Sequence, residues 1–152
     1  MRNIIINTFV CGIVVCPFLC FSTLAPVSAQ DTTDQIISQL DEILTQNPLP
    51  AGQKAQTIKI AEDNTITFTI MRVTEGAGLK PHFHKTHDEV IYVIRGTGQI
   101  FVNDKWVDVK PGSVHFNPIG KVHSSKQTGT EPLIGISIFT PAMKEPDRHF
   151  VQ

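Results

Sequence analysis

The chain has 152 residues, 41% of them hydrophobic, and its 13 basic and 14 acidic side chains give a formal charge of -1. This is the size and composition of one globular domain with a sizeable core. The balanced charge, with no basic patch between aromatic residues, argues against nucleic acid or an anionic membrane surface as a partner.

Residues 1–29 have the pattern of a signal peptide. Arg2 precedes the apolar run IIINTFVCGIVVCPFLCFSTLA, and Val27-Ser28-Ala29 fits the small-residue pattern before a cleavage site. We predict cleavage after Ala29 and a secreted or periplasmic mature protein without stable membrane insertion. A retained membrane anchor is the alternative, because the apolar run is nearly long enough to span a bilayer. All three cysteines lie in this segment, so the mature chain would have no disulfide and no thiolate ligand.

Residues 30–50 are predicted to form an N-terminal amphipathic helix and a linker. In DTTDQIISQLDEILT (residues 31–45), apolar side chains recur at helical spacing and form one face: Ile36, Ile37, Leu40, Ile43 and Leu44. Thr32 or Thr33 is placed to cap the helix, with Gln35 completing a capping box. A helix this short is marginal alone in water, so its apolar face is expected to dock on the remaining domain or on a second subunit.

Residues 51–152 are predicted to form an all-β domain. In TITFTIMRV (residues 65–73), threonines alternate with apolar side chains, which is the period of a strand. Further β-rich runs follow: EVIYVIR, QIFVN, KWVDVK, SVHFNP and PLIGISIFT. Glycine, proline and Asn-Asp turn signals separate these runs, and no helical period intervenes. Many short strands joined by turns indicate an antiparallel sandwich or barrel.

The run EVIYVIR (residues 89–95) is apolar on both faces. One face can line the interior, and the other also needs cover. We favour a homodimer through this sheet, with coverage by the N-terminal helix as the alternative. The large aromatic side chains are expected in the core or lining a cavity: Phe101, Trp106, Phe116 and Phe139.

The stretch PHFHKTHDE (residues 81–89) holds three of the six histidines. On a strand, residues two apart point the same way, so His82 and His84 present both imidazoles to one ion. Glu89 follows a short loop and opens the next strand, which can return it to the same place. A fourth donor must come from elsewhere, and His123, just after a Pro-Gly turn, fits that need.

The spacing around these residues resembles the two motifs of the cupin family. The first motif runs through Gly76, His82, His84, Glu89 and Gly96. The second runs through Gly112, Pro118, Gly120 and His123, and its final position, often asparagine, is Gln127 here. The short spacing between the motifs is usual for small cupins, and the resemblance covers about residues 55–141.

This resemblance implies a small single-domain antiparallel jelly-roll barrel in which His82, His84, Glu89 and His123 bind one divalent metal. Three imidazoles and one carboxylate suit manganese, iron, nickel, copper or zinc. Cupins include dioxygenases, isomerases, epimerases, lyases and sugar-binding modules, and the fold does not choose among them. We expect a dioxygenase-like metalloenzyme acting on a small molecule, with Glu89 also serving as general base, as similarity to quercetinase-type cupins suggests. The alternatives are a non-catalytic metal or small-ligand binding module and a sugar-acid isomerase or lyase.

Other polar residues receive different predictions. His87 is expected to be an exposed loop histidine, with an entrance or proton-relay role as the alternative, and Asp88 is expected to be solvated. His115 faces the cavity or is a hydrogen-bonded histidine of the barrel. His149 is expected on the surface. Gly96 and Gly98 are expected to adopt positive φ at a tight hairpin turn.

Overall fold

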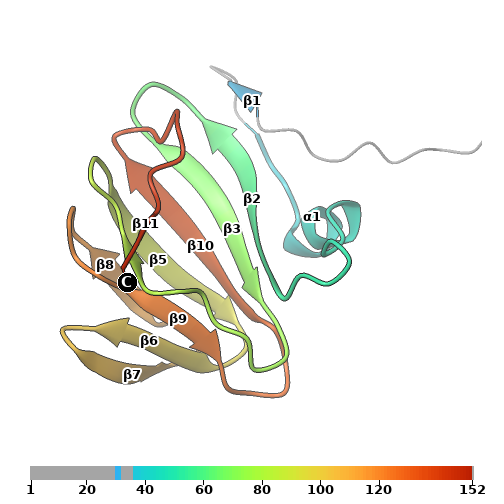
Figure 1. The fold of residues 1–152 in the computed structure, drawn as a ribbon. Coiled ribbons are helices and arrows are strands. Elements are labelled where there is room, and N and C mark those ends of the chain that lie inside the picture. Colours follow the sequence, from blue (N-terminus) through green and yellow to red (C-terminus); the bar gives the residue numbers. More distant parts are fainter. Residues whose placement is uncertain (1–29, 32–35, 152) are drawn as a thin grey trace, which may run out of the picture.

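The computed structural model describes residues 30–31 and 36–151, which form eleven strands and one short helix (Figure 1). The predicted signal peptide and the predicted capping residues, Thr32, Thr33 and Gln35, lie outside the described residues. Within the part of the chain that is described, no helix combines the length and the apolar character that a membrane span requires.

Two antiparallel sheets make up most of the fold. The larger sheet contains, in spatial order, β1 (Gln30–Asp31), β2 (Ala55–Glu62), β3 (Thr67–Val73), β10 (Leu133–Thr140), β5 (Asp88–Arg95) and β8 (Val114–Asn117). The smaller sheet contains β7 (Lys105–Val109), β6 (Gly98–Val102) and β9 (Ser124–Gln127). A third pair joins β11 (His149–Phe150) to β4 (His82–Phe83), and β1 pairs with β2 in parallel. The predicted all-β, antiparallel class with one helix is confirmed.

Part of the interior of the domain is purely apolar. Met71, Val73, Val93 and Leu133 form a buried cluster there. Each of them projects inward from a strand of the larger sheet, as the period of two requires. Full burial of such a side chain contributes about 1.5–3 kcal/mol. Packing within this cluster stabilises the larger sheet, which also carries Glu89.

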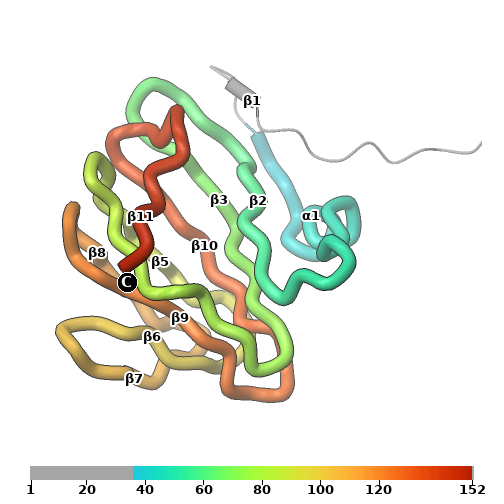
Figure 2. The backbone as a smooth tube through the Cα atoms, viewed as in Figure 1, coloured from blue at the N-terminus to red at the C-terminus, as the bar shows by residue number. Residues whose placement is uncertain are grey.

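The outer face of the larger sheet is covered by α1 (Leu40–Gln46) (Figure 2). Ile43 of α1 is buried against Ile58, Ile60, Ile70 and Ile134 of the sheet. The prediction that the helix docks on the domain is confirmed. Ile94 of β5 packs against the same cluster, so α1 covers part of the second apolar face of β5. The homodimer stays a prediction.

The predicted start of the helix is wrong. The helix begins at Leu40, and Gln39 occupies the N-cap position without a side-chain hydrogen bond. The preceding residues from Ile36 are not helical, and Ile37 is 93% exposed. Two adjacent β-branched residues lose side-chain freedom in a helix, so they extend it poorly where packing does not compensate.

Three further expectations change in the structure. β2 begins at Ala55 and lies before the first strand identified in the sequence, in TITFTIMRV. Trp106 is 42% and Phe116 is 55% exposed, so neither belongs to the core, although Phe116 lines an open surface cavity; Phe139 is buried. β7 and β8, which carry Trp106 and Phe116, are edge strands with one face open to solvent.

Gly96 is required by both its conformation and its surroundings. Its φ is +75°, and a Cβ at this position would collide with the carbonyl oxygen of Pro132. The expectation of positive φ is therefore confirmed at Gly96. Gly98 does not adopt positive φ; it lies against the backbone carbonyl of Lys126 instead, which also excludes a side chain.

Candidate metal centre

The two histidine-bearing segments are joined directly through their backbones. His82 and His123 form an antiparallel bridge, in which the His82 N–H donates to the His123 carbonyl at 3.0 Å and the reverse bond is 2.9 Å. The Gly120 N–H also donates to the His84 carbonyl at 2.7 Å. Gly120 has a φ of +76°, a conformation that a glycine adopts without strain. These bonds hold the predicted donors of both motifs at one place.

Each of the three imidazoles is oriented by a backbone carbonyl. The Nδ1 atoms of His82, His84 and His123 lie 2.8, 2.7 and 3.0 Å from carbonyl oxygens of Lys80, Asp147 and Lys121, respectively. A carbonyl only accepts, so each Nδ1 must carry the proton. The Nε2 atom of each neutral ring then presents its lone pair for a ligand.

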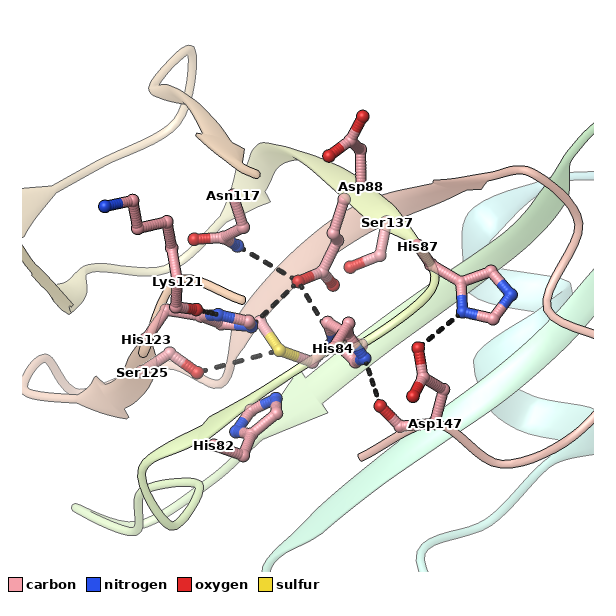
Figure 3. A network of polar contacts seen from close by, with 12 residues as sticks. His82, His84, His87, Asp88, Asn117, Lys121, His123, Ser125, Ser137 and Asp147 are labelled. Carbon is pink, nitrogen blue, oxygen red and sulfur yellow. Dashed lines mark hydrogen bonds and ion pairs between the residues drawn. The ribbon is translucent and has the colours of Figure 1, made fainter. Parts of the chain in front are cut away.

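The three imidazoles converge (Figure 3). One ligand nitrogen from each of His82, His84 and His123 lies within 4.8 Å of the other two. A metal–nitrogen bond is about 2.1 Å, so two nitrogens on opposite sides of one ion lie about 4 Å apart. The Nε2 atoms of His84 and His123 are buried and have no hydrogen-bond partner. Buried acceptors without partners are rare and point to an absent ion or water.

Glu89 completes the cluster from the start of β5. Its Oε2 lies 3.1 Å from Nε2 of His123 and 3.8 Å from Nε2 of His84. The Asn117 side-chain amide donates to the same oxygen at 3.0 Å. Glu89 and Asn117 face each other across the β5–β8 pair. The structure thus brings the three predicted imidazoles together and places Glu89 beside two of them, His84 and His123.

The protonation states suit a metal site. Burial lowers the pKa of His82 to about 4 and also lowers the pKa of His84. Burial alone would raise the pKa of Glu89, but hydrogen bonds and neighbouring charges outweigh burial, and the pKa falls below its usual value. At neutral pH His82 and His84 are therefore neutral and Glu89 is ionised, the forms in which these side chains bind metal.

A cavity opens beside the cluster. It is narrow, with a volume of about 10 Å³, and its walls include His82, Glu89, His123 and Arg148. Apolar side chains and serines form the remaining wall: Met71, Leu79, Ile91, Ile100, Phe139, Ser124, Ser125 and Ser137, with Thr57. His115 lies at the edge of the cluster, with its ring 6.5 Å from that of His123, and burial lowers its pKa.

One prediction about the neighbouring loop is wrong. His87 is not exposed; it retains 7% exposure and its Nδ1 lies 2.7 Å from Oδ2 of Asp147. Asp88 is partly buried, and its Oδ1 accepts a hydrogen bond from the Ile119 N–H at 2.8 Å. His149 lies at the surface, as predicted, and is partly covered because it stacks on Phe83. The C-terminal segment covers this loop, which no local pattern indicated.

Gln127 stands where the second motif often has asparagine, and it is buried. Its side-chain oxygen accepts from the Gly76 N–H at 2.6 Å, and its amide donates to the carbonyls of Gly129 and Glu131. It thereby ties the start of the first motif to the end of the second. This position is structural in this chain.

Asn117, Asp147 and Arg148 were not among the predicted site residues. Asn117 directly precedes Pro118 of the second motif, so the motif could have identified it. Asp147 and Arg148 lie in the C-terminal stretch EPDRHFVQ, at no fixed spacing from either motif. Only the pairing of β11 with β4 brings them to the site.

Comparisons with known proteins agree with this fold. Residues 69–139 match the cupin domain family. The glucose-6-phosphate isomerase of Thermococcus onnurineus is 36% identical over 67 residues, which are 40% of this chain and 35% of that protein. The oxalate-binding protein of Thermotoga maritima is 33% identical over 66 residues, which are 43% of this chain and 54% of that protein. The match thus spans about a third to a half of the length of these relatives.

Among solved structures, an uncharacterized conserved protein of Klebsiella pneumoniae with a double-stranded β-helix domain resembles the chain with a TM-score of 0.64. Its sequence identity is 19%, and the match covers 78% of this chain and 99% of that one. This likeness shows the fold. Together with the domain match, it supports a small cupin with a cluster of three histidines suited to a divalent metal.

Proposed function

We propose that the chain binds one divalent transition metal through His82, His84, His123 and Glu89. The proposal rests on hydrogen-bond acceptors that point toward one another: Nε2 of His84, Nε2 of His123 and the Glu89 carboxylate. With its proton on Nδ1, His123 directs a lone pair at a carboxylate oxygen of Glu89 only 3.1 Å away. Two acceptors at that distance repel each other unless a cation lies between them. One divalent ion satisfies this pair and the buried Nε2 of His84, and manganese, iron, nickel, copper and zinc all suit the donor set.

The ligand that we propose is a small carboxylate with a second oxygen donor. Three neutral imidazoles and one carboxylate leave a divalent site with a net charge of about +1, which favours an anion. The wall that contains His82 and His123 also contains Arg148. A guanidinium matches a carboxylate with two parallel hydrogen bonds. The name of the Thermotoga maritima relative, an oxalate-binding protein, is consistent with this class of ligand.

The first candidate activity is a dioxygenase-like reaction on that ligand. A bound divalent ion supplies Lewis-acid polarisation of the substrate oxygens. Glu89 is ionised and buried at the cluster, so its carboxylate accepts a proton from the substrate. Asn117 holds that carboxylate in place through its amide. Ile91 and Phe139 line the cavity and limit the access of water. Sugar-acid isomerisation uses the same groups, and the name of the Thermococcus onnurineus relative, a glucose-6-phosphate isomerase, is consistent with isomerisation as the reaction type.

A binding module without turnover is the second candidate. Glu89 is the single carboxylate among the described residues that line the cavity. Its lowered pKa makes it a weaker base than an ordinary glutamate. A site with only one weak base is well suited to capture a ligand and poorly suited to repeated proton transfer.

The test begins with the metal content of the purified protein and of apoprotein reloaded with Mn²⁺, Fe²⁺ or Zn²⁺. Calorimetry with oxalate then measures ligand binding, and an oxygen electrode reports turnover of oxalate and small hydroxy-acids. Arg148→Ala should weaken oxalate binding at unchanged metal content. Arg95→Ala is the matched control, because Arg95 pairs with exposed Asp41. Absence of metal after reloading contradicts the proposal, and oxalate binding without oxygen uptake or product supports the binding module.

We also propose that the protein is exported, on the basis of the apolar segment before Gln30. Intact-mass measurement of protein isolated from its native compartment should place the mature N-terminus at Gln30. A mass that retains residues 1–29 would contradict export by cleavage at this site.

A further inference from the structure

The segment after β10 folds back over the loop that carries the first two histidines. His149 and Phe150 of β11 pair with Phe83 and His82 of β4. The N–H of Val151 continues this pairing by donating to the Pro81 carbonyl at 3.1 Å. Figures 1 and 2 show this last segment running beside the strand that begins at His82. The C-terminal segment is therefore a wall of the candidate metal centre.

Asp147 anchors this segment. Its side chain is 8% exposed, and both carboxylate oxygens accept hydrogen bonds. Oδ1 accepts from the Lys85 N–H at 3.1 Å and from His149 Nε2 at 2.9 Å. Oδ2 accepts from the Thr86 N–H at 2.9 Å, the Thr86 hydroxyl at 2.8 Å and His87 Nδ1 at 2.7 Å. One buried carboxylate thus fixes the loop between His84 and Glu89.

The backbone of the same residue orients a predicted ligand. The Asp147 carbonyl accepts the Nδ1 proton of His84 at 2.7 Å (Figure 3). The corresponding carbonyls for His82 and His123 belong to residues only two positions earlier, so those two imidazoles are oriented by their own strands. His84 depends instead on a residue from the far end of the chain. The orientation of the His84 ring therefore depends on how firmly Asp147 is held.

We propose that Asp147 is a positioning residue for the metal centre: its carboxylate locks the 85–87 loop, and its carbonyl thereby holds His84 with Nδ1 protonated and Nε2 directed at the metal. This inference rests on the proposed metal-binding function. Residues that orient a metal-bound histidine commonly change metal affinity about 10–100-fold when they are altered. The buried Asp147–His87 pair is then part of the site, which gives His87 a supporting role through Asp147.

Asp147→Asn is the test variant, because it keeps the shape and one acceptor but turns an amide N–H₂ toward the donors of Thr86 and His87. Asp147→Ala is the second variant. Asp63→Asn is the matched control: Asp63 also fixes a turn through the N–H groups of Thr65 and Ile66, at the β2–β3 connection. Folding of each apoprotein is verified by circular dichroism, and all measurements are made well below its unfolding temperature.

Two readouts separate positioning from general stability. The first is Co²⁺ affinity, by competition with a chelator, together with the visible spectrum of the bound ion. The expected result is about 10–100-fold weaker binding and a shifted spectrum for Asp147→Asn, and wild-type values for Asp63→Asn. The second readout needs no metal: nitrogen NMR of the His84 ring should show the Nδ1-protonated tautomer in the wild-type apoprotein and a mixture of tautomers in Asp147→Asn.

The outcomes are distinct. A folded Asp147→Asn that keeps the Nδ1-protonated tautomer of His84 overturns the positioning role, as does unchanged Co²⁺ affinity and spectrum. If wild type binds no Co²⁺, the proposed metal function fails, while the tautomer measurement still decides whether Asp147 orients His84. If Asp147→Ala does not fold, Asp147→Asn decides the question, and loss of Co²⁺ binding in Asp63→Asn as well would assign the effect to stability.

Discussion

Replacement of His84 by alanine tests the candidate metal centre most directly. The variant removes one of four converging donors and leaves the other three in place. Loss of a partner outside the coordination shell already weakens metal binding about 10–100-fold, so loss of a ligand should exceed about 100-fold. That factor corresponds to about 2.7 kcal/mol of binding free energy. Bound metal should therefore fall to a small fraction of one ion per chain after gel filtration.

The same substitution should leave the metal-free domain folded, because two effects on its stability oppose each other. The Asp147 carbonyl loses the hydrogen bond from His84, which costs about 1–3 kcal/mol if that oxygen stays buried. The folded state also no longer buries an Nε2 atom without a partner, which returns a similar amount. A net change of about 1 kcal/mol would move the midpoint of thermal unfolding by only about 2–8 °C.

The assay combines elemental analysis of Mn²⁺- or Co²⁺-loaded protein with thermal unfolding of the apoprotein. His115→Ala is the matched control, since it removes another half-buried imidazole near His123 that has no predicted ligand role. It should retain metal at the wild-type level. If His84→Ala still holds one ion with wild-type affinity, or if His115→Ala loses metal equally, the donor set is wrong.

Two other predictions concern stability. In the folded chain the pKa of His82 is about 4 because of burial, whereas the unfolded value is near 6.5, so the unfolded state binds more protons between these pH values. The free energy of unfolding of the apoprotein should therefore fall as pH is lowered from about 6.5 to about 4, by at most about 1.4 kcal/mol per pH unit for this group. Urea unfolding of wild type and His82→Asn at pH 7, 5.5 and 4.5 measures this fall. If the free energy of unfolding changes equally with pH in both proteins, His82 is excluded as the cause. Gly96→Ala should destabilise the domain more than Gly112→Ala: both positions have positive φ, which costs an alanine about 1–2 kcal/mol, but only at Gly96 does a Cβ collide with backbone. Similar urea midpoints for the two variants would contradict this.

The sequence predicted the fold class because it depends on local rules, whereas the approach of His123 to the residues of the first motif was implied by the resemblance to the cupin motifs. The period of two in TITFTIMRV placed β3, and the separation of His82 from His84 placed two imidazoles on one side of the chain. The spacing of glycines and prolines around His123 added the remaining imidazole. In β3 and in the His82–His84 pair, the spacing within a short stretch determines the local geometry, and tertiary packing did not change it.

The failures concern residues whose surroundings come from distant parts of the chain. His87 looks solvated until Asp147 covers it, and nothing within its own loop indicates a partner from the C-terminal stretch. Phe116 looks like a core residue, yet β8 is an edge strand whose outer face has no neighbour among the described residues. The prediction of the helix start failed for a local reason: Ile36 and Ile37 fit the apolar face of the helix but are poor helix formers.

Without the proposed ion, repulsion between buried acceptors would destabilise the folded state. Metal binding should therefore be linked to folding. Lone pairs of His84 and His123 and an oxygen of Glu89 converge in a buried space where water screens them little. Under the proposed function, a cation that relieves this repulsion should bind the folded chain and not the unfolded one, so at 1,000 times its dissociation constant it should add about 4 kcal/mol to the free energy of unfolding. Thermal unfolding of wild type with saturating Mn²⁺, Co²⁺ or Zn²⁺ measures the gain, which His84→Ala should largely lose. An unfolding midpoint that none of these ions raises would mean that a proton between His123 and Glu89 already satisfies the site.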